Sequence, residues 1–219
     1  ATEAGEFPAT ITARHRKEAA QRSDLPGVGD FVALQLSGCD GPALIEAVLP
    51  RTTAMVRKAA GEQRPQLIAA NIDVIFIVTA LDRDFNLQRL ERYLALARDS
   101  GATPVIVANK SDLPHDAAET VEQIAKFAPG VPVHAISARG AKGVAELERY
   151  FDGNRTIVLV GSSGVGKSTM TNQLLGRDAQ TTQEVRAHDS RGRHTTTHRQ
   201  LFIRPQGGAI IDTPGMRGL

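Results

Sequence analysis

The sequence predicts an α/β protein in which a small β-rich module precedes a doubly wound sheet. From about residue 67, short apolar runs alternate with segments of helical spacing, which is the pattern of strands and crossover helices. Before that point the chain shows only short strand-like runs separated by turn sequences. We therefore expect a β-module with a basic linker at residues 1–64 and an α/β domain at residues 65–219.

The composition excludes several classes of protein. No apolar run approaches the roughly 18 residues that a membrane helix needs, and the first residues lack the basic and apolar segments of a secretion signal. Cys39 is the only cysteine, so neither an internal disulfide nor a cysteine-rich zinc site can form. These features predict a cytoplasmic protein that does not enter a membrane. The formal net charge of +2 is too small to indicate a nucleic-acid partner by itself.

The β-module is expected to contain three strands, at residues 7–13, 31–36 and 43–49. Residues 50–66 carry four basic side chains against one acidic side chain, and they show neither helical nor strand periodicity. We interpret this stretch as a linker that is either simply solvated or in contact with nucleic acid.

The α/β domain begins with a fully apolar strand at residues 74–78, as expected for a sheet that is covered on both faces. A helix follows, with apolar residues at helical spacing from 87 to 97. The later elements are expected strands at 103–108, 131–136, 156–160, 201–203 and 209–211 and helices at 117–127, 144–151 and 170–175. Because ligands of such sheets bind at the carboxyl ends of the strands, the functional residues should lie there.

A glycine-rich segment follows the strand at 156–160. Gly161-Ser-Ser-Gly-Val-Gly-Lys-Ser-Thr169 fits the pattern G-x-x-x-x-G-K-[ST], with a strand before it and a helix that begins near Lys167. Its backbone N–H groups can surround a phosphate, and the helix dipole adds to the attraction. Lys167 would bind the outer phosphates and act in catalysis, while the Ser168 hydroxyl would ligate Mg²⁺. The expected nucleotide-binding residues here are Gly161, Ser162, Ser163, Gly164, Val165, Gly166, Lys167, Ser168 and Thr169.

A second motif, Asn109-Lys-Ser-Asp112, follows the strand at 103–108 directly. The carboxylate of Asp112 can accept hydrogen bonds from both the ring N1–H and the 2-amino group of guanine, whereas adenine offers no such pair of donors. Hydrogen bonds to charged groups contribute roughly 1.5–3 kcal/mol each, so this contact would select guanine strongly. Asn109 would bond the base and tie the loops together, and Lys110 would lie over the base and sugar.

Ser137-Ala-Arg139, which follows the strand at 131–136, is interpreted as a companion loop of the base reader. In this interpretation Ser137 and Ala138 bind the nucleotide, and the backbone N–H of Ala138 donates to guanine O6.

Two further segments complete the expected site. Asp212-Thr-Pro-Gly215 follows the last strand, where Asp212 can hold Mg²⁺ through water and the Gly215 N–H can contact a γ-phosphate. Gly192-Arg-His-Thr-Thr-Thr197 lies in a long polar stretch and would form a switch loop. Either Thr195 or Thr196 would complete the Mg²⁺ shell, and Thr196 is also a catalytic candidate.

The residue that follows Gly215 is Met216, where many GTPases place a glutamine that orients the attacking water. Methionine cannot do this, so we expect slow intrinsic turnover that another group or a partner accelerates. His194 is the catalytic candidate from this chain, with Arg193 and His198 nearby.

The base reader precedes the phosphate loop, which reverses the order of most guanine-nucleotide switches. With this order the sequence closely resembles the circularly permuted GTPases of the ribosome small subunit-dependent GTPase A family (RsgA, also called YjeQ). The resemblance covers roughly residues 25–219, including Leu25 to Val32 and Ala69 to Asp73. It implies an N-terminal OB-fold and a permuted GTPase domain. It also implies a GTPase that assists late maturation of the 30S ribosomal subunit through rRNA contacts, with hydrolysis stimulated by that particle.

The sequence departs from the family in two respects. Members carry a C-terminal zinc domain, which we expect to be absent from this chain because it stops at Leu219, so no zinc site is placed here. The β-module also has three expected strands where an OB-fold has five. We expect Mg²⁺ as cofactor, GTP and GDP as substrate and product, and a monomer.

Three other interpretations remain open. A phosphate-loop ATPase or small-molecule kinase is disfavoured by Asp112, and a non-catalytic RNA-binding module is disfavoured by the switch threonines and Asp212. A GTP-dependent switch with an RNA or protein partner and no role in ribosome assembly would share all of this chemistry.

Overall fold

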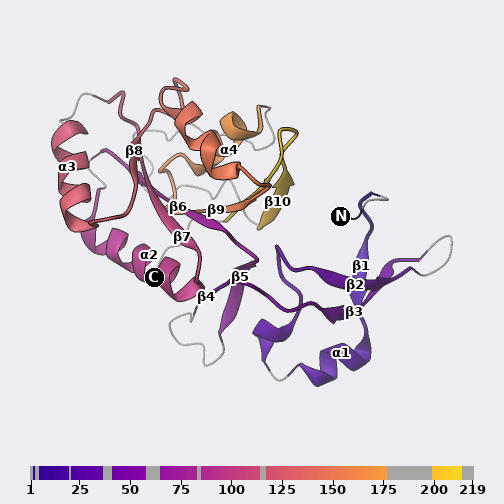
Figure 1. Ribbon diagram of the computed structural model, residues 1–219. Helices are drawn as coiled ribbons and strands as arrows, with labels where there is room; N and C mark the ends of the chain where they lie inside the picture. The colour runs from indigo at the N-terminus through magenta and orange to yellow at the C-terminus, as the bar shows by residue number, and fades with distance from the viewer. Residues whose placement is uncertain are drawn as a thin grey trace.

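The computed structural model describes residues 2, 5–19, 21–36, 41–57, 65–82, 85–113, 117–176 and 199–213. Figure 1 shows two parts, a small N-terminal module that contains β1–β3 and a larger α/β part built on one sheet. Among the described helices, none is long and apolar enough to cross a membrane.

The larger part is built on a six-stranded sheet with the order β10-β11-β9-β6-β7-β8. Neighbouring strands are parallel except for β10 and β11, which are antiparallel, so the sheet is mixed. The strands are β6 (Val74–Ala80), β7 (Thr103–Asn109), β8 (Val133–Ala135), β9 (Thr156–Val160), β10 (Gln200–Ile203) and β11 (Ala209–Asp212). The apolar runs of the sequence therefore form the expected sheet.

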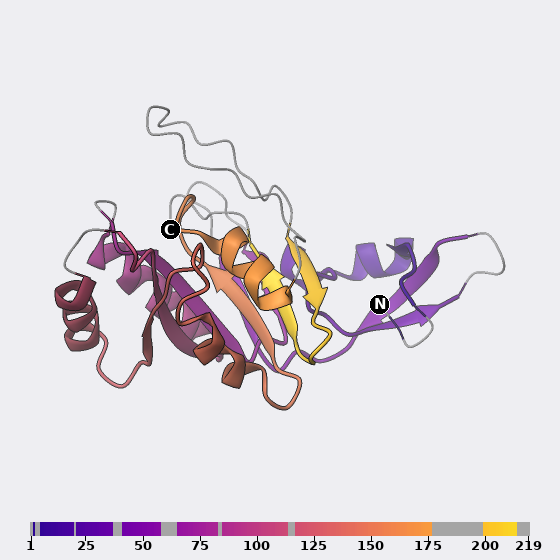
Figure 2. The same cartoon turned by 90° about the horizontal axis from the view of Figure 1, so that it is seen from above.

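Alternate residues of the central strand β6 enter two different cores, as the period of two in a strand requires. Ile75 and Ile77 pack with the buried faces of α2 (Leu87–Ser100) and α3 (Ala117–Phe127). Phe76 and Val78 pack with α4 (Lys167–Leu175) and the 3₁₀ helix η2 (Val144–Phe151). Figure 2 shows the two sets of helices on opposite faces of the sheet. Residues 144–151, expected as an ordinary helix, thus adopt the tighter 3₁₀ form.

The N-terminal module holds a three-stranded sheet of β1 (Ala9–Ile11), β3 (Ala43–Val48) and β2 (Val32–Gln35), in that order. The expected strand at 7–13 is shorter than predicted. It is followed by a short helix, α1 (Ala13–Glu18), whose first turn is capped by the Thr12 hydroxyl. The described residues of the module form this sheet, and no closed barrel is seen in them.

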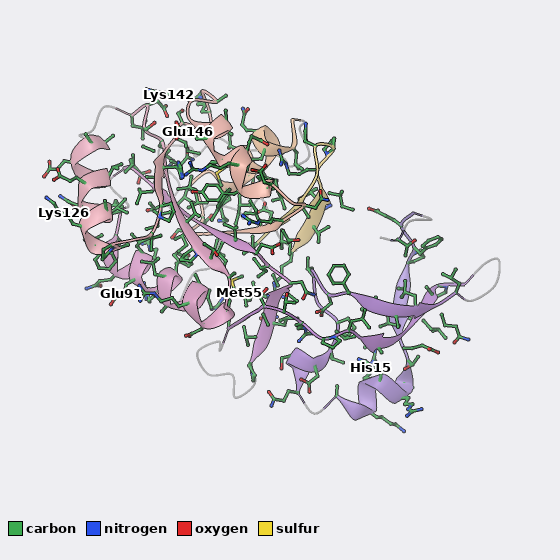
Figure 3. The ribbon with its side chains drawn as sticks, viewed as in Figure 1. His15, Met55, Glu91, Lys126, Lys142 and Glu146 are labelled. Atoms are coloured by element: carbon green, nitrogen blue, oxygen red, sulfur yellow. The ribbon has the colours of Figure 1, made fainter. Side chains whose placement is uncertain are left out.

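The expected linker at 50–66 was wrong in its central part. Residues Ala54–Arg57 form β4, which pairs antiparallel with β5 (Gln66–Ala70). Met55 on β4 is fully buried and belongs to the same core as α2, beside which it lies in Figure 3. The boundary expected between residues 64 and 65 therefore divides a packed two-stranded ribbon.

Two sequence segments that resemble the family meet where the module joins this ribbon. The backbone N–H of Ala70 donates to Val28 O (3.0 Å), and Asn71 Nδ2 donates to Gly29 O (2.9 Å). Gly29 has φ +92°, and a Cβ there would lie 2.1 Å from Ala70 O, so only glycine fits this junction. Arg199, just before β10, also donates from a guanidinium nitrogen to Leu67 O on β5 at 3.0 Å.

Candidate functional site

The phosphate loop connects β9 to α4 and passes close to two other parts of the chain. A Cβ on Gly161 would lie 2.3 Å from Val78 O on β6, and a Cβ on Gly166 would lie 2.2 Å from Asn109 Nδ2. Both glycines also have positive φ, of +152° and +97°. The loop therefore depends on glycine at these positions both for its shape and for its approach to β6 and β7.

Lys167 begins α4 and turns back over the phosphate loop. Its Nζ donates to the carbonyl oxygens of Gly161 and Ser162, at 2.9 Å each. The side chain is buried, and burial lowers the pKa of Lys167 from 10.5 to about 8, an effect that the Asp212 carboxylate opposes. A buried cation whose hydrogen bonds, among the described residues, go to neutral carbonyls is well placed to bind an anion such as a phosphate.

The side chain of Asn109 joins the base-reading loop to the phosphate loop. Its Nδ2 donates to Val165 O at 2.8 Å, and its Oδ1 accepts from the backbone N–H of Ala138 at 2.9 Å. One buried amide thus connects segments that are 56 and 29 residues away in the sequence. The three predicted motifs lie together at the carboxyl edge of the sheet.

Asp112 lies beside the companion loop. A side-chain hydrogen bond with Ser137 holds the pKa of Asp112 below its ordinary value, and the charges of Arg139 and Lys110 add to this effect. The carboxylate is exposed. A charged, accessible acceptor of this kind is what recognition of the guanine N–H groups requires.

The backbone N–H of Ala138 already has a partner in the structure, and its contact with guanine stays a prediction. This N–H was expected to donate to guanine O6, but in the structure it donates to Asn109 Oδ1. A contact with the base would require this hydrogen bond to be shared or exchanged.

Lys110 pairs with Asp82, which lies two residues after the end of β6 and belongs to none of the motifs. Lys110 Nζ lies 2.8 Å from Asp82 Oδ2, and both side chains are partly exposed. The backbone of Lys110 has φ +67°, an unusual conformation for a lysine. The ion pair gives the lysine a defined direction, while its aliphatic part remains able to contact a nucleotide.

Asp212 ends β11, and its register places it opposite Leu159 of β9, two residues before the phosphate loop. The carboxylate is fully buried. Thr213 Oγ1 donates to Leu159 O at 2.7 Å and so fixes the end of β11 against β9. Ser168 is half-buried in the first turn of α4. A carboxylate and a hydroxyl at this edge suit a hard cation such as Mg²⁺.

Several predicted site residues lie outside the described residues. These are Arg193, His194, Thr195, Thr196, His198, Gly215 and Met216. Within the described part of the chain, no group of three or more His, Cys, Asp or Glu side chains could hold a metal ion.

Sequence reasoning missed three side chains that support the site. Asp82 pairs with Lys110, and the first turn of α2 supplies Arg89, which donates to Ser162 Oγ at 2.9 Å. Tyr93 lies one helical turn after Arg89 and also has a hydrogen bond with Ser162. The sequence offered one sign of this support. Arg89 and Tyr93 are four residues apart and therefore share one face of the helix, so both could contact the same neighbour.

Comparison with known proteins identifies the family of this chain. The profile of the family described as RsgA GTPase matches residues 48–219. The small ribosomal subunit biogenesis GTPase RsgA 2 of Lactiplantibacillus plantarum is 48% identical over 218 residues, which cover 100% of this chain and 62% of that protein. The RsgA protein of Opitutus terrae is 48% identical over 225 residues, which cover 98% of this chain and 61% of the relative. The chain therefore spans about three-fifths of the length of these curated relatives.

Two solved structures have a similar fold. YjeQ from Thermotoga maritima superposes with a TM-score of 0.68 and 25% identity, covering 97% of this chain and 68% of that one. YloQ, described as a circularly permuted GTPase, superposes with a TM-score of 0.61 and 23% identity, covering 94% and 62%. The family match over residues 48–219 and the relatives at 48% identity show that the chain belongs to the RsgA GTPase family.

Proposed function

We propose that this protein binds GTP with Mg²⁺ and hydrolyses it to GDP and inorganic phosphate. The observation that supports this most directly is the Asn109 side chain, which bonds Val165 in the phosphate loop and Ala138 in the companion loop. Because Asp112 follows Asn109 by three residues, we expect the base reader and the phosphate loop to bind the same ligand. Guanine is favoured over adenine because an accessible carboxylate needs N–H donors on the base.

In this proposal each residue of the site has a defined role. The phosphate loop binds the phosphates through its backbone N–H groups, and Lys167 exchanges its carbonyl partners for phosphate oxygens. Asp112 accepts hydrogen bonds from N1–H and the 2-amino group, with Ser137 supporting its charge. Ser168 and Asp212 would hold Mg²⁺, which supplies charge neutralisation at the phosphate oxygens when bound. Thr195 or Thr196 would join this set.

The water that attacks the γ-phosphorus needs a group to orient it, and Met216 cannot supply one. We therefore propose slow intrinsic turnover, and His194 as the candidate that a partner brings into position. If His194 acts in this way, His194→Ala removes the stimulated rate and leaves the basal rate. An unchanged stimulated rate would exclude His194.

The biological role that we propose is assistance in late maturation of the 30S ribosomal subunit in the cytoplasm, with rRNA contacts and stimulation of hydrolysis by that particle. It is supported by the names of the relatives, which are small ribosomal subunit biogenesis GTPases. The N-terminal module would then correspond to an OB-like fold, and the protein would act as a monomer.

The test is sedimentation with purified 30S and 50S particles in GDP and in a non-hydrolysable GTP analogue, together with GDP production with and without 30S particles. We expect binding to 30S in the GTP-like state and a higher rate of GDP production. Nucleotide binding without any preference for 30S would instead favour a switch with another RNA or protein partner. ATP competing as well as GTP would contradict the guanine assignment.

A further inference from the structure

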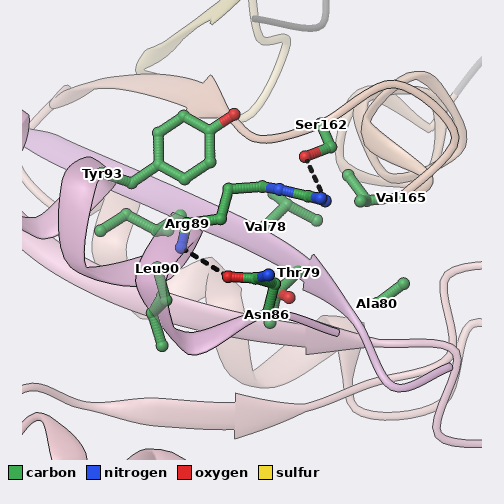
Figure 4. Close-up of a pocket in the computed structure, with 10 residues that line it drawn as sticks. Val78, Thr79, Ala80, Asn86, Arg89, Leu90, Tyr93, Ser162 and Val165 are labelled. Carbon is green, nitrogen blue, oxygen red and sulfur yellow. Dashed lines mark hydrogen bonds between the residues drawn. The ribbon is translucent and has the colours of Figure 1, made fainter. Parts of the chain in front are cut away.

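The first part of α2 lies beside the phosphate loop. Figure 4 shows a pocket between the end of β6, the start of α2 and the phosphate loop, into which Arg89 extends. Arg89 comes from α2, and Ser162 and Val165 come from the phosphate loop. Contact between the helix and the loop at this place is polar, although most of α2 packs through apolar side chains.

Arg89 is held in place through its backbone and through the end of its side chain. Its backbone N–H donates to Oδ1 of Asn86, the residue that caps α2, at 3.0 Å. Its guanidinium Nη1 donates to Ser162 Oγ at 2.9 Å, a contact between residues 73 positions apart in the sequence. The helix start is therefore fixed by its cap, and the charged end of Arg89 reaches the second residue of the phosphate loop.

Tyr93 reaches the same hydroxyl from one turn further along the helix. It is 3% exposed, and burial raises the pKa of its hydroxyl, whereas a hydrogen bond with Ser162 acts in the opposite direction. Figure 4 shows the Tyr93 hydroxyl and the Arg89 guanidinium directed toward Ser162. Two side chains of one helix thus converge on one serine.

Ser162 connects this contact to the phosphate-binding lysine. While its hydroxyl bonds Arg89, its backbone carbonyl accepts from Lys167 Nζ at 2.9 Å. A rotation of the Ser162 peptide would turn this carbonyl and would also redirect the neighbouring N–H groups that line the loop. Fixing the hydroxyl therefore limits the conformations of the loop.

We propose that Arg89 and Tyr93 are positioning residues that clamp Ser162 and keep the phosphate loop in its phosphate-binding conformation. This inference rests on the proposed function, because it concerns the affinity of the same site for nucleotides. Neither residue needs to touch the nucleotide. Their effect is transmitted through the Ser162 hydroxyl, and this property distinguishes a clamp from general support of the fold.

A double-mutant cycle tests the clamp. The dissociation constants for GDP and a non-hydrolysable GTP analogue are measured for the wild type, Arg89→Met, Ser162→Ala and the double variant. Because one charge-assisted hydrogen bond at a half-buried site is lost, we expect Arg89→Met to weaken binding about tenfold. Ser162→Ala should weaken it to a similar extent, and the double variant should be no weaker than either single variant.

Further variants separate positioning from stability. Arg89→Lys keeps one donor and should restore part of the affinity, and Tyr93→Phe removes only the hydroxyl. Arg98→Met, an exposed arginine near the other end of α2, is the matched control and should leave the dissociation constants unchanged. Thermal unfolding without nucleotide identifies any variant whose loss of affinity follows from loss of fold.

The outcomes are distinct. A wild-type protein that binds neither GDP nor the GTP analogue would overturn the proposed function and the clamp with it. A wild type that binds both, with additive effects of Arg89→Met and Ser162→Ala or no effect of Arg89→Met, would overturn the clamp alone.

Discussion

The candidate site has a phosphate half, residues 161–169, and a base half, residues 109–112 and 137–139. The two halves differ in the environment of their charged side chains before a nucleotide binds. Lys167 in the phosphate half is buried, and its pKa falls to about 8 because burial disfavours the cation. Asp112 in the base half is exposed, and a hydrogen bond with Ser137 lowers its pKa, which favours the anion. Phosphate binding therefore relieves an unfavourable charge, whereas base binding uses a charge that is already stabilised.

The base half is tested most strongly by Asp112→Asn. In the proposed role this change removes the charge that accepts two N–H groups of guanine, so we expect the affinity for GDP to fall by about 100-fold or more. The measurement is a titration of each variant with GDP. Asp99→Asn, an exposed carboxylate at the end of α2, is the control. If Asp112→Asn bound GDP as tightly as the wild type, Asp112 would not read the base.

The contact between the two halves is tested by Gly166→Ala. A methyl group there would meet Asn109 Nδ2 in addition to the strain of a positive φ, so we expect GDP affinity to fall about 30-fold. Gly153→Ala is the matched control, since Gly153 has φ +75° and open space around its Cβ position. It should cost about 1 kcal/mol of stability without changing the dissociation constant. Equal effects of the two changes on binding would show that the loops do not depend on each other.

The phosphate half should give GDP binding a particular pH dependence. Lys167 must be protonated to bind phosphate, and its pKa without nucleotide is about 8, so affinity should be constant below that pH and fall above it. At pH 9 about a tenth of the side chain is protonated, and binding should be about tenfold weaker than at pH 7. Isothermal titration in buffers of different ionisation enthalpy should also record proton uptake.

Lys167→Met is the control for this profile, because it removes the titrating group while the titration of the nucleotide itself remains. The difference between the two profiles belongs to Lys167. The stability of the protein without nucleotide should depend on pH in the opposite direction from GDP affinity. The unfolded chain holds the Lys167 proton more tightly than the folded protein does, so the contribution of Lys167 to the free energy of unfolding rises as the pH increases from about 8 toward 10.5. A wild-type profile as flat as that of the variant would contradict the lowered pKa.

The smallest effect is expected for Asp82→Asn, which removes the ion pair with Lys110. Both side chains are partly exposed, so the change should weaken GDP binding by about fivefold at most. The difference should shrink in high salt. Glu122→Gln removes a similar pair with Lys126 on α3 and should have no effect on binding. An effect of Asp82→Asn above tenfold would mean that Asp82 does more than direct Lys110.

Local patterns allowed most of the α/β part to be predicted. The strand at 156–160 and the helix at 117–127 have the expected bounds, because continuous apolar runs and helical spacing identify such elements. The strand β4 could not be found in this way, since its four residues lie in a basic stretch and depend on pairing with β5. The short helix α1 likewise has one apolar residue and is stabilised by its Thr12 cap.

The motifs of the site could be predicted, but the residues that hold them could not. Both motifs can be recognised in a single sequence because their residues have fixed spacings. This holds for the glycines and lysine of the phosphate loop and for the Asn-Lys-x-Asp tetrad. Asp82 meets Lys110 across 28 residues, and Arg89 meets Ser162 across 73. Such contacts leave no periodic pattern, because they arise only when the sheet brings its strand ends together.

The Asn109 side chain has a consequence for synthesis of the chain. Its two partners, Ala138 and Val165, both follow it in the sequence. A nascent polypeptide that has extended past Asp112 but not to Val165 already contains the proposed purine reader, yet it lacks the carbonyl that accepts from the Asn109 amide. If the protein binds GTP as proposed, capture of the nucleotide during translation would wait for the glycine-rich turn, whereas in the usual order of such motifs it would wait for the purine reader.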